Sequence, residues 1–183
     1  MTRFPRAQQG AALFVSLILL LVLTITAVSS MQGTLLQEKM VSAQRDGQIA
    51  FEGAEHALRE AEALLRGATL PDFDNTDGLY DEDGDAPVGA ELFAAATWDG
   101  DATTAASMPQ SGGKNLLAEA PRYFIQRLDP ASLTLNTQLD LNVENYSNSD
   151  GEAKVHAYRI VARSTGTSGQ APRIVEEYFV REQ

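Results

Sequence analysis

The chain has 183 residues, of which 44% are hydrophobic, and its formal net charge is −11. This balance fits one ordinary globular domain with an added apolar segment, and it argues against a long disordered acidic protein. The strong negative charge makes nucleic acid a poor candidate for direct binding, and the lack of cysteine leaves the redox compartment open.

The first predicted element is an apolar helix. No residue between Arg6 and Glu38 carries a charge, and residues 11–28 are nearly all Ala, Leu, Ile, Val and Phe. A helix of this length spans roughly 27 Å, close to the hydrocarbon thickness of a bilayer. We therefore expect one membrane span. The alternatives are a buried core helix and a secretory signal that is cut near Ser29.

Charges at the two ends of this span predict its orientation. Arg3 and Arg6 precede it, whereas all 25 acidic side chains lie after Gly10. Cytoplasmic flanks are enriched in Lys and Arg, so the short N-terminus is expected to stay in the cytoplasm while the acidic remainder faces outward.

The helical pattern continues beyond the span. Apolar and small residues recur there at three- and four-residue steps. They are Leu36, Met40, Ala43, Gly47, Ala50, Ala54, Leu58, Ala61 and Leu65. We predict a nearly continuous helix from about Gly10 to Arg66, with Gly67 as its stop and an amphipathic outer half against a globular domain. The small residues indicate either close approach of a sheet or helix, or only the high helix propensity of alanine.

Residues 68–120 are predicted to form long loops with one short helix at 90–98. Acidic side chains crowd into residues 72–85, where Asp81, Asp83 and Asp85 offer oxygen ligands to a hard cation such as calcium. A solvated acidic loop is the default interpretation, and the full EF-hand pattern is absent. We therefore expect no cofactor, with Ca²⁺ at these three carboxylates as the alternative.

The last third has the alternation of an antiparallel sheet. Predicted strands cover residues 122–128, 155–163 and 173–181, with a weaker one near 139–143, an exposed turn at 145–151 and a hairpin loop at 164–172. The predicted fold is α+β, with the long N-terminal helix packed on a C-terminal antiparallel sheet.

Catalytic groupings are sparse. The two histidines, His56 and His156, have no cysteine to join in a soft-metal site. The segment 111–114 lacks the spacing of a phosphate loop, and no nucleophile stands with a base. We expect no enzyme. The aromatic residues Tyr80, Phe93 and Trp98 either contact partners or complete a small core.

Several blocks carry a family resemblance. The string from Arg6 to Leu17 is similar to the class III signal of a type IV prepilin, a short basic leader and a glycine before a hydrophobic helix. Residues 36–40, 50–59, 74–80 and 158–166 resemble the PilX family of type IV pilus minor pilins. The resemblance implies a pilin-like fold, cleavage by a prepilin peptidase after Gly10 and methylation of Ala11.

The resemblance also implies an organisation for the chain. Residues 1–10 are then a basic leader, 11–34 a helix for the membrane and the filament core, and 35–183 a pilin-like head in the periplasm. Four residues of the helix, Val15, Leu17, Leu20 and Leu21, are expected to take part in assembly. Val15 stands where most pilins have a glutamate, as in other tip-located minor pilins and in the K-type pseudopilin of type II secretion.

The function implied is that of a minor pilin that helps to initiate a type IV pilus and is built into it at the tip, supporting adhesion, twitching motility or DNA uptake. Its expected partners are other minor pilins, the major pilin, the prepilin peptidase and, before assembly, the inner membrane. We expect a single-pass inner-membrane protein that later reaches the pilus and the cell surface. A K-like pseudopilin and an unprocessed, membrane-anchored periplasmic binding or sensor domain are the alternatives.

Overall fold

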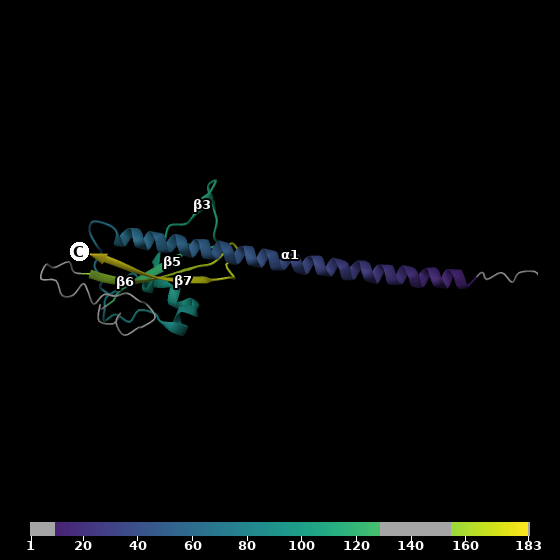
Figure 1. Ribbon diagram of the computed structural model, residues 1–183, viewed down its shortest axis with the longest axis horizontal. Coiled ribbons are helices and arrows are strands. Elements are labelled where there is room, and N and C mark those ends of the chain that lie inside the picture. The colour runs from purple at the N-terminus through teal and green to yellow at the C-terminus, as the bar shows by residue number, and fades with distance from the viewer. Residues whose placement is uncertain (1–9, 129–154, 183) are drawn as a thin grey trace, which may run out of the picture. The chain divides into compact units, whose positions relative to one another are not determined.

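The computed structural model describes residues 10–128 and 155–182 (Figure 1). The chain divides into two compact units, residues 1–44 and 45–183, and helix α1 (Ala11–Leu65) contributes to both. Both ends of α1 lie within one residue of the predicted limits. The last backbone hydrogen bonds of this helix, from Arg66 N to Glu62 O (2.8 Å) and from Gly67 N to Leu64 O (3.2 Å), tighten its final turn.

The second unit contains an antiparallel sheet of three long strands. They are β5 (Arg122–Leu128), β6 (Val155–Ser164) and β7 (Arg173–Glu182), paired in the order β5-β6-β7. The three strong strand predictions are thereby confirmed. The weaker strand near 139–143 and the turn at 145–151 lie outside the described residues.

Two short strands add to the free edge of β5. Strand β1 (Leu79–Tyr80) runs parallel to β5 and pairs with its residues 125–126. Strand β2 (Thr104–Ala105) runs antiparallel to β5 and pairs with residues 122–123, nearer the start of that strand. A separate hairpin is formed by β3 (Gln110–Ser111) and β4 (Lys114–Asn115). The predicted long loops thus contain short paired segments.

The helix predicted at 90–98 is wrong in type. Two 3-10 helices, η1 (Gly89–Phe93) and η2 (Ala95–Trp98), replace it, with Ala94 extended between them, and η3 (Gly100–Ala102) follows. Leu92 and Trp98 are both buried. One α-helix would place residues six apart about 120° from each other around its axis, so the break at Ala94 lets both side chains reach the same core.

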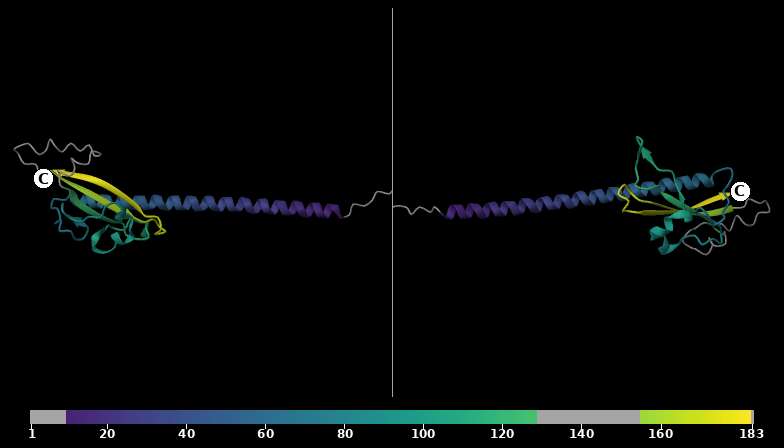
Figure 2. Two further views of the ribbon diagram at one scale, coloured as in Figure 1. Left: turned by 90° about the horizontal axis from the view of Figure 1, so that it is seen from below. Right: turned by 180° about the vertical axis from the view of Figure 1, so that it is seen from behind.

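The sheet separates two apolar clusters. On one face, α1 packs against alternate residues of the three long strands, among them Tyr158 and Ile160. On the other face, the segment with the 3-10 helices contributes Trp98, which packs with Phe124 of β5 and Val161 of β6. Figures 1 and 2 show α1 and the 3-10 helices on opposite sides of the sheet. Successive side chains along each strand therefore enter the two clusters in turn. The predicted α+β pilin-like fold is confirmed.

The buried stripe of α1 begins later than the periodicity predicts. Leu36, Met40 and Ala43 are exposed, and Gly47 is the first buried residue of the helix. The buried set is Gly47, Ala50, Gly53, Ala54, Ala57, Leu58, Ala61 and Leu65. The part of α1 that packs in the head thus presents mainly Gly and Ala to the sheet.

Candidate functional site

The junction between Gly10 and Ala11 lies at the start of α1. Gly10 is in the turn before the helix, its carbonyl accepts a 3.4 Å hydrogen bond from Phe14 N, and Ala11 is the first helical residue. Gly10 is exposed, with open space where a Cβ would be. The Gly10–Ala11 peptide therefore lies at an exposed end of the helix.

The first unit contributes an apolar helix surface that the described residues leave uncovered. Every position from Ala11 to Gln44 is exposed, including the predicted assembly residues Val15, Leu17, Leu20 and Leu21. By length and composition, α1 is the one helix in the described part of the chain that is long and apolar enough to cross a membrane. Such a helix needs lipid or other apolar helices around it.

Four hydroxyl groups within this apolar surface donate hydrogen bonds to carbonyls of the helix itself. Ser16 donates to Leu13 O (2.8 Å), and Thr24 donates to Leu21 O (2.7 Å). Thr34 makes the same kind of bond to a carbonyl four residues earlier. These bonds remove the cost of placing hydroxyls in an apolar surrounding, and the helix is unbroken through this region.

Gly53 marks a close approach of α1 to the rest of the head. A Cβ at this position would lie within 2.8 Å of Leu117 Cδ1 and would collide with the Ser164 hydroxyl. Both neighbours are buried, so neither side chain has free space to move into. The structure therefore favours the close-approach interpretation of the small-residue stripe at this point.

The β6–β7 loop is attached to α1 through Asp46. The carboxylate accepts hydrogen bonds from Thr167 Oγ1 (2.8 Å), from Ser168 N (3.0 Å) and from the Ser168 hydroxyl. The side-chain and backbone hydrogen bonds from Ser168, followed by that from Thr167, lower the pKa of Asp46. A Cβ at Gly166 would collide with the backbone of Asp46, so glycine is required for this contact.

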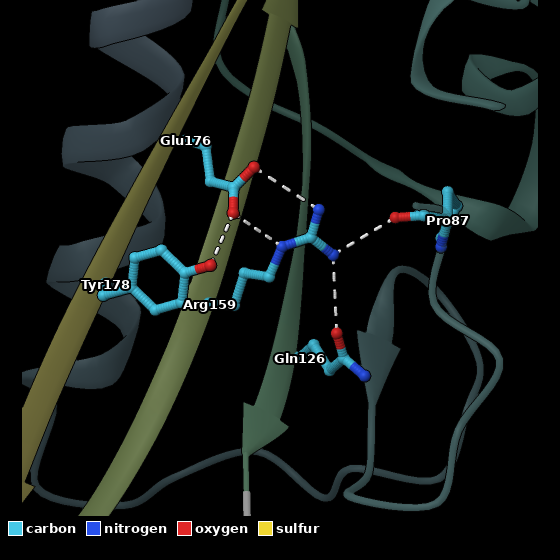
Figure 3. A network of polar contacts seen from close by, with 5 residues as sticks. All are labelled: Pro87, Gln126, Arg159, Glu176 and Tyr178. Carbon is cyan, nitrogen blue, oxygen red and sulfur yellow. Dashed lines mark hydrogen bonds and ion pairs between the residues drawn. The ribbon is translucent and has the colours of Figure 1, made fainter. Parts of the chain in front are cut away.

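A buried arginine joins the three long strands to the loop segment (Figure 3). The Arg159 side chain lies between Glu176 on one side and Pro87 and Gln126 on the other. Its Nε donates to Glu176 Oε1 (2.9 Å), and its Nη1 donates to Pro87 O (3.1 Å) and more weakly to Gln126 Oε1 (3.5 Å). Tyr178 donates to the same Glu176 oxygen at 2.8 Å. The network therefore ties Pro87 to the sheet.

The surroundings of Arg159 explain why its charge is tolerated. The residue is only 7% exposed, and its guanidinium also lies 5.6 Å from the centre of the Phe124 ring. Burial raises the pKa of Glu176, but hydrogen bonds from Arg159 and Tyr178 and the arginine charge outweigh it, so this pKa is below its ordinary value. A buried cation needs such a partner.

Strand β7 also closes the C-terminal end of α1. The Arg181 guanidinium donates to Leu65 O and, at 2.8 Å, to Gly67 O. A cation at a helix C-terminus interacts favourably with the helix dipole and satisfies carbonyls that lack intrahelical partners. Beside it, Arg66 lies over the Phe179 ring at 5.4 Å and pairs with Glu62 at 2.7 Å.

The acidic loop is organised by protein groups. Asp81 pairs with Arg127 at 2.6 Å, and its backbone N–H donates to Asn75 Oδ1 at 3.0 Å. Asp83 and Asp85 are exposed. Within residues 10–128 and 155–182, no three His, Cys, Asp or Glu side chains are grouped to hold a metal ion.

His56 shares the Ser107 hydroxyl with a carboxylate. His56 Nε2 lies 3.0 Å from Ser107 Oγ, but this hydroxyl is also 2.6 Å from Glu60 Oε2 and donates to it. In a serine nucleophile the hydroxyl donates its hydrogen bond to the histidine that acts as its base. Here the Ser107 hydroxyl donates to the Glu60 carboxylate instead. The contact attaches the segment after β2 to α1.

Two of the three aromatic residues singled out in the sequence complete a core. Tyr80 and Trp98 are buried, and their rings lie 5.8 and 5.9 Å from that of Phe124. Phe93 differs, since it is 82% exposed. Sequence reasoning did not identify Asp46, Arg159 or Arg181. The signal available for Arg159 was its place in an apolar strand, on the same face as Val161.

Two models of one protein family match the chain. The PilX N-terminal family model matches residues 9–59, and the model described as type IV pilus assembly protein PilX C-term matches residues 62–181. No curated protein and no solved structure matches the chain. The two matched regions meet within α1 close to its C-terminal end, so together they take in the apolar helix, the sheet and the loops between them.

Proposed function

The chain belongs to the PilX family of type IV pilus assembly proteins and is a minor pilin, and from this premise we propose that it is cut after Gly10, methylated at Ala11 and built into the tip of a type IV pilus. Its apolar helix anchors it in the inner membrane first, with the head, residues 35–183, in the periplasm. The helix then moves into the filament, beside other minor pilins and the major pilin.

The observation that carries this proposal is the uncovered apolar surface of α1 before Gln44. A surface of this kind is satisfied either by lipid or by a bundle of similar helices, and transfer between the two exchanges one apolar surrounding for another. Val15, Leu17, Leu20 and Leu21 are exposed and available to contact neighbouring helices. In a type IV pilus, the apolar N-terminal helices of neighbouring pilins would form this bundle.

The basic leader explains why cleavage precedes assembly. Arg3 and Arg6 stand directly before the apolar helix, and withdrawing the helix from the membrane would draw both cations into the hydrocarbon core. Removal of residues 1–10 by the prepilin peptidase eliminates that cost. Cleavage therefore acts as a release step from the membrane.

Val15 supports a position at the tip. Most pilins have a carboxylate there that pairs with the terminal amine of a neighbouring subunit, and valine has no group for this pairing. A chain without the acid can lie above its neighbours but is a poor repeating shaft subunit. Val15→Glu is expected to raise the number of copies per filament, whereas the uncharged control Val15→Gln is not.

The experiment that tests the proposal is intact-mass analysis of the full chain from membranes of hosts with and without the prepilin peptidase. We expect a chain that begins at methylated Ala11 only when the peptidase is present. Retention of residues 1–10 in both hosts would instead support an unprocessed, membrane-anchored periplasmic domain. A cut near Ser29 would make the chain a secreted protein.

A pseudopilin of a type II secretion filament is the second candidate, because the absence of an acid at Val15 fits the K-type pseudopilin equally well. Deletion of the chain separates the two functions. Loss of pili, with loss of adhesion, twitching motility or DNA uptake, supports the pilus. Loss of protein secretion with normal pili supports the second candidate.

A further inference from the structure

A run of exposed apolar residues lies on η1 and η2 and beside them. Phe93 is 82% exposed and Val88 57% exposed, and four alanines beside them in sequence are exposed as well. We call this the 88–96 surface, made of Val88, Ala90, Phe93, Ala94, Ala95 and Ala96. Four consecutive exposed apolar residues, from Phe93 to Ala96, are unfavourable in water unless another surface covers them.

The 88–96 surface is held rigidly from both ends. Pro87, the residue before it, is bound through its carbonyl by the buried Arg159. At the other end Trp98 is fully buried, and its Nε1 donates to Leu92 O at 2.9 Å. Phe93 is therefore displayed on a fixed backbone and loses little conformational freedom when it is covered, which favours binding.

Acidic side chains accompany the surface. Glu91 lies within it, and Asp99 and Asp101 follow on the next turns, all three exposed. None of them takes part in an ion pair among the described residues. A partner that buries Phe93 would bring its own surface close to these three carboxylates. Complementary charge then requires an apolar pocket for Phe93, referred to below as a socket, with basic side chains around its rim.

The size of the surface identifies the kind of partner. Its six residues are far fewer than the roughly 20–30 residues per side of a stable pair in solution. Such a contact becomes effective only when the partner is already held nearby, because tethering raises its effective concentration. Subunits anchored side by side through their N-terminal helices meet this condition.

We propose that the 88–96 surface docks the head of an adjacent pilin-type subunit, with Phe93 inserted into an apolar socket that has a basic rim. This inference rests on the proposed function, since the filament or the membrane supplies the tether. The surface thus selects which neighbour the head accepts, whereas the apolar helix allows entry into the bundle.

The test uses the full chain in its host, with a photo-crosslinking phenylalanine analogue at position 93. We expect light-dependent crosslinks to a second pilin-type subunit, identified by mass spectrometry. Crosslinks to the chain's own residues 129–154, to a protein that is not a pilin or to lipid would overturn the proposal, and so would an absence of crosslinks.

A pair of variants separates this contact from assembly in general. Phe93→Ser is expected to keep the wild-type melting temperature and processing at Gly10, but to reduce incorporation about tenfold or more. The control Leu116→Ser, at another exposed apolar residue of the head, is expected to change incorporation little. Equal incorporation of both variants would overturn the docking role alone, whereas a wild-type chain that is never incorporated would refute the proposed function itself.

Discussion

Replacing Gly53 with alanine is the sharpest test of how α1 packs in the head. In an unrestricted helix the change stabilises by about 1 kcal/mol, because glycine is the poorer helix former. At this position the added Cβ would meet the Ser164 hydroxyl and lie within 2.8 Å of Leu117 Cδ1, both in buried side chains. Overpacking of a filled core costs about 1–3 kcal/mol. We therefore expect a net loss of about 1 kcal/mol.

The same helix offers a matched control. Gly33 has nothing within 4 Å of its Cβ position, so Gly33→Ala keeps the gain in helix propensity without the collision. Thermal unfolding of the full chain in detergent should show a melting temperature lowered by about 3 °C for Gly53→Ala and not lowered for Gly33→Ala. A melting temperature that Gly53→Ala leaves unchanged or raises would refute the close-approach argument.

A double variant locates the collision. Ser164→Ala removes the hydroxyl that the new methyl group would meet, so the loss caused by Gly53→Ala should be smaller in the Ser164→Ala background. Strictly additive losses would place the strain elsewhere than at this contact.

Three further substitutions test the polar contacts of the head by thermal unfolding of the full chain. Glu176→Gln should destabilise by about 1 kcal/mol at neutral pH, since its partner Arg159 is buried while Glu176 is partly exposed. The depressed pKa of Glu176 contributes stability above its ordinary value of 4.5, and that contribution is lost as the pH falls through the folded value, so the gap between variant and wild type should close in acid. Glu177→Gln should do the opposite and stabilise slightly at neutral pH, with a gain that vanishes as the pH falls to 4.5, because burial and then the carboxyl of Glu62 raise the pKa of Glu177. Arg181→Met should cost about 1–2 kcal/mol through the lost carbonyl contacts at the end of α1, against less than about 0.5 kcal/mol for a substitution at an exposed surface arginine.

The long elements were predictable from periodicity. The helix repeats its apolar residues over many turns, and the three long strands alternate over seven to ten residues, so the pattern greatly exceeds chance. Strands β1 and β2 have two residues each and no period to detect. They form because the loops carry them to the open edge of β5, which is a property of the folded chain.

The polar contacts were not predictable for the same reason. Arg159 stands on the strand face opposite α1, where an alternating strand would place it in water. In the structure, the segment that contains η1 and η2 covers this face of the sheet. That segment has no hydrophobic periodicity, so its burial of the face could not be predicted from the sequence. In the acidic loop, carboxylate spacing left Ca²⁺ open as an alternative to a solvated loop, whereas in the structure the Asp81 carboxylate pairs with Arg127.

The sequence left open which of the aromatic residues in the loop segment are buried and which are exposed. The sequence singled out Tyr80, Phe93 and Trp98 together as aromatic residues of a loop region. Composition does not distinguish the two that are buried from the one that is displayed, because the distinction depends on the break at Ala94. Site residues in such segments follow from local backbone geometry.

The most direct test of the account is N-terminal sequencing and copy counting of this chain in pili sheared from host cells. The account predicts a chain that begins at methylated Ala11, present at one or a few copies per filament. Absence of the chain from the sheared pili, or its presence with residues 1–10 still attached, would contradict the account.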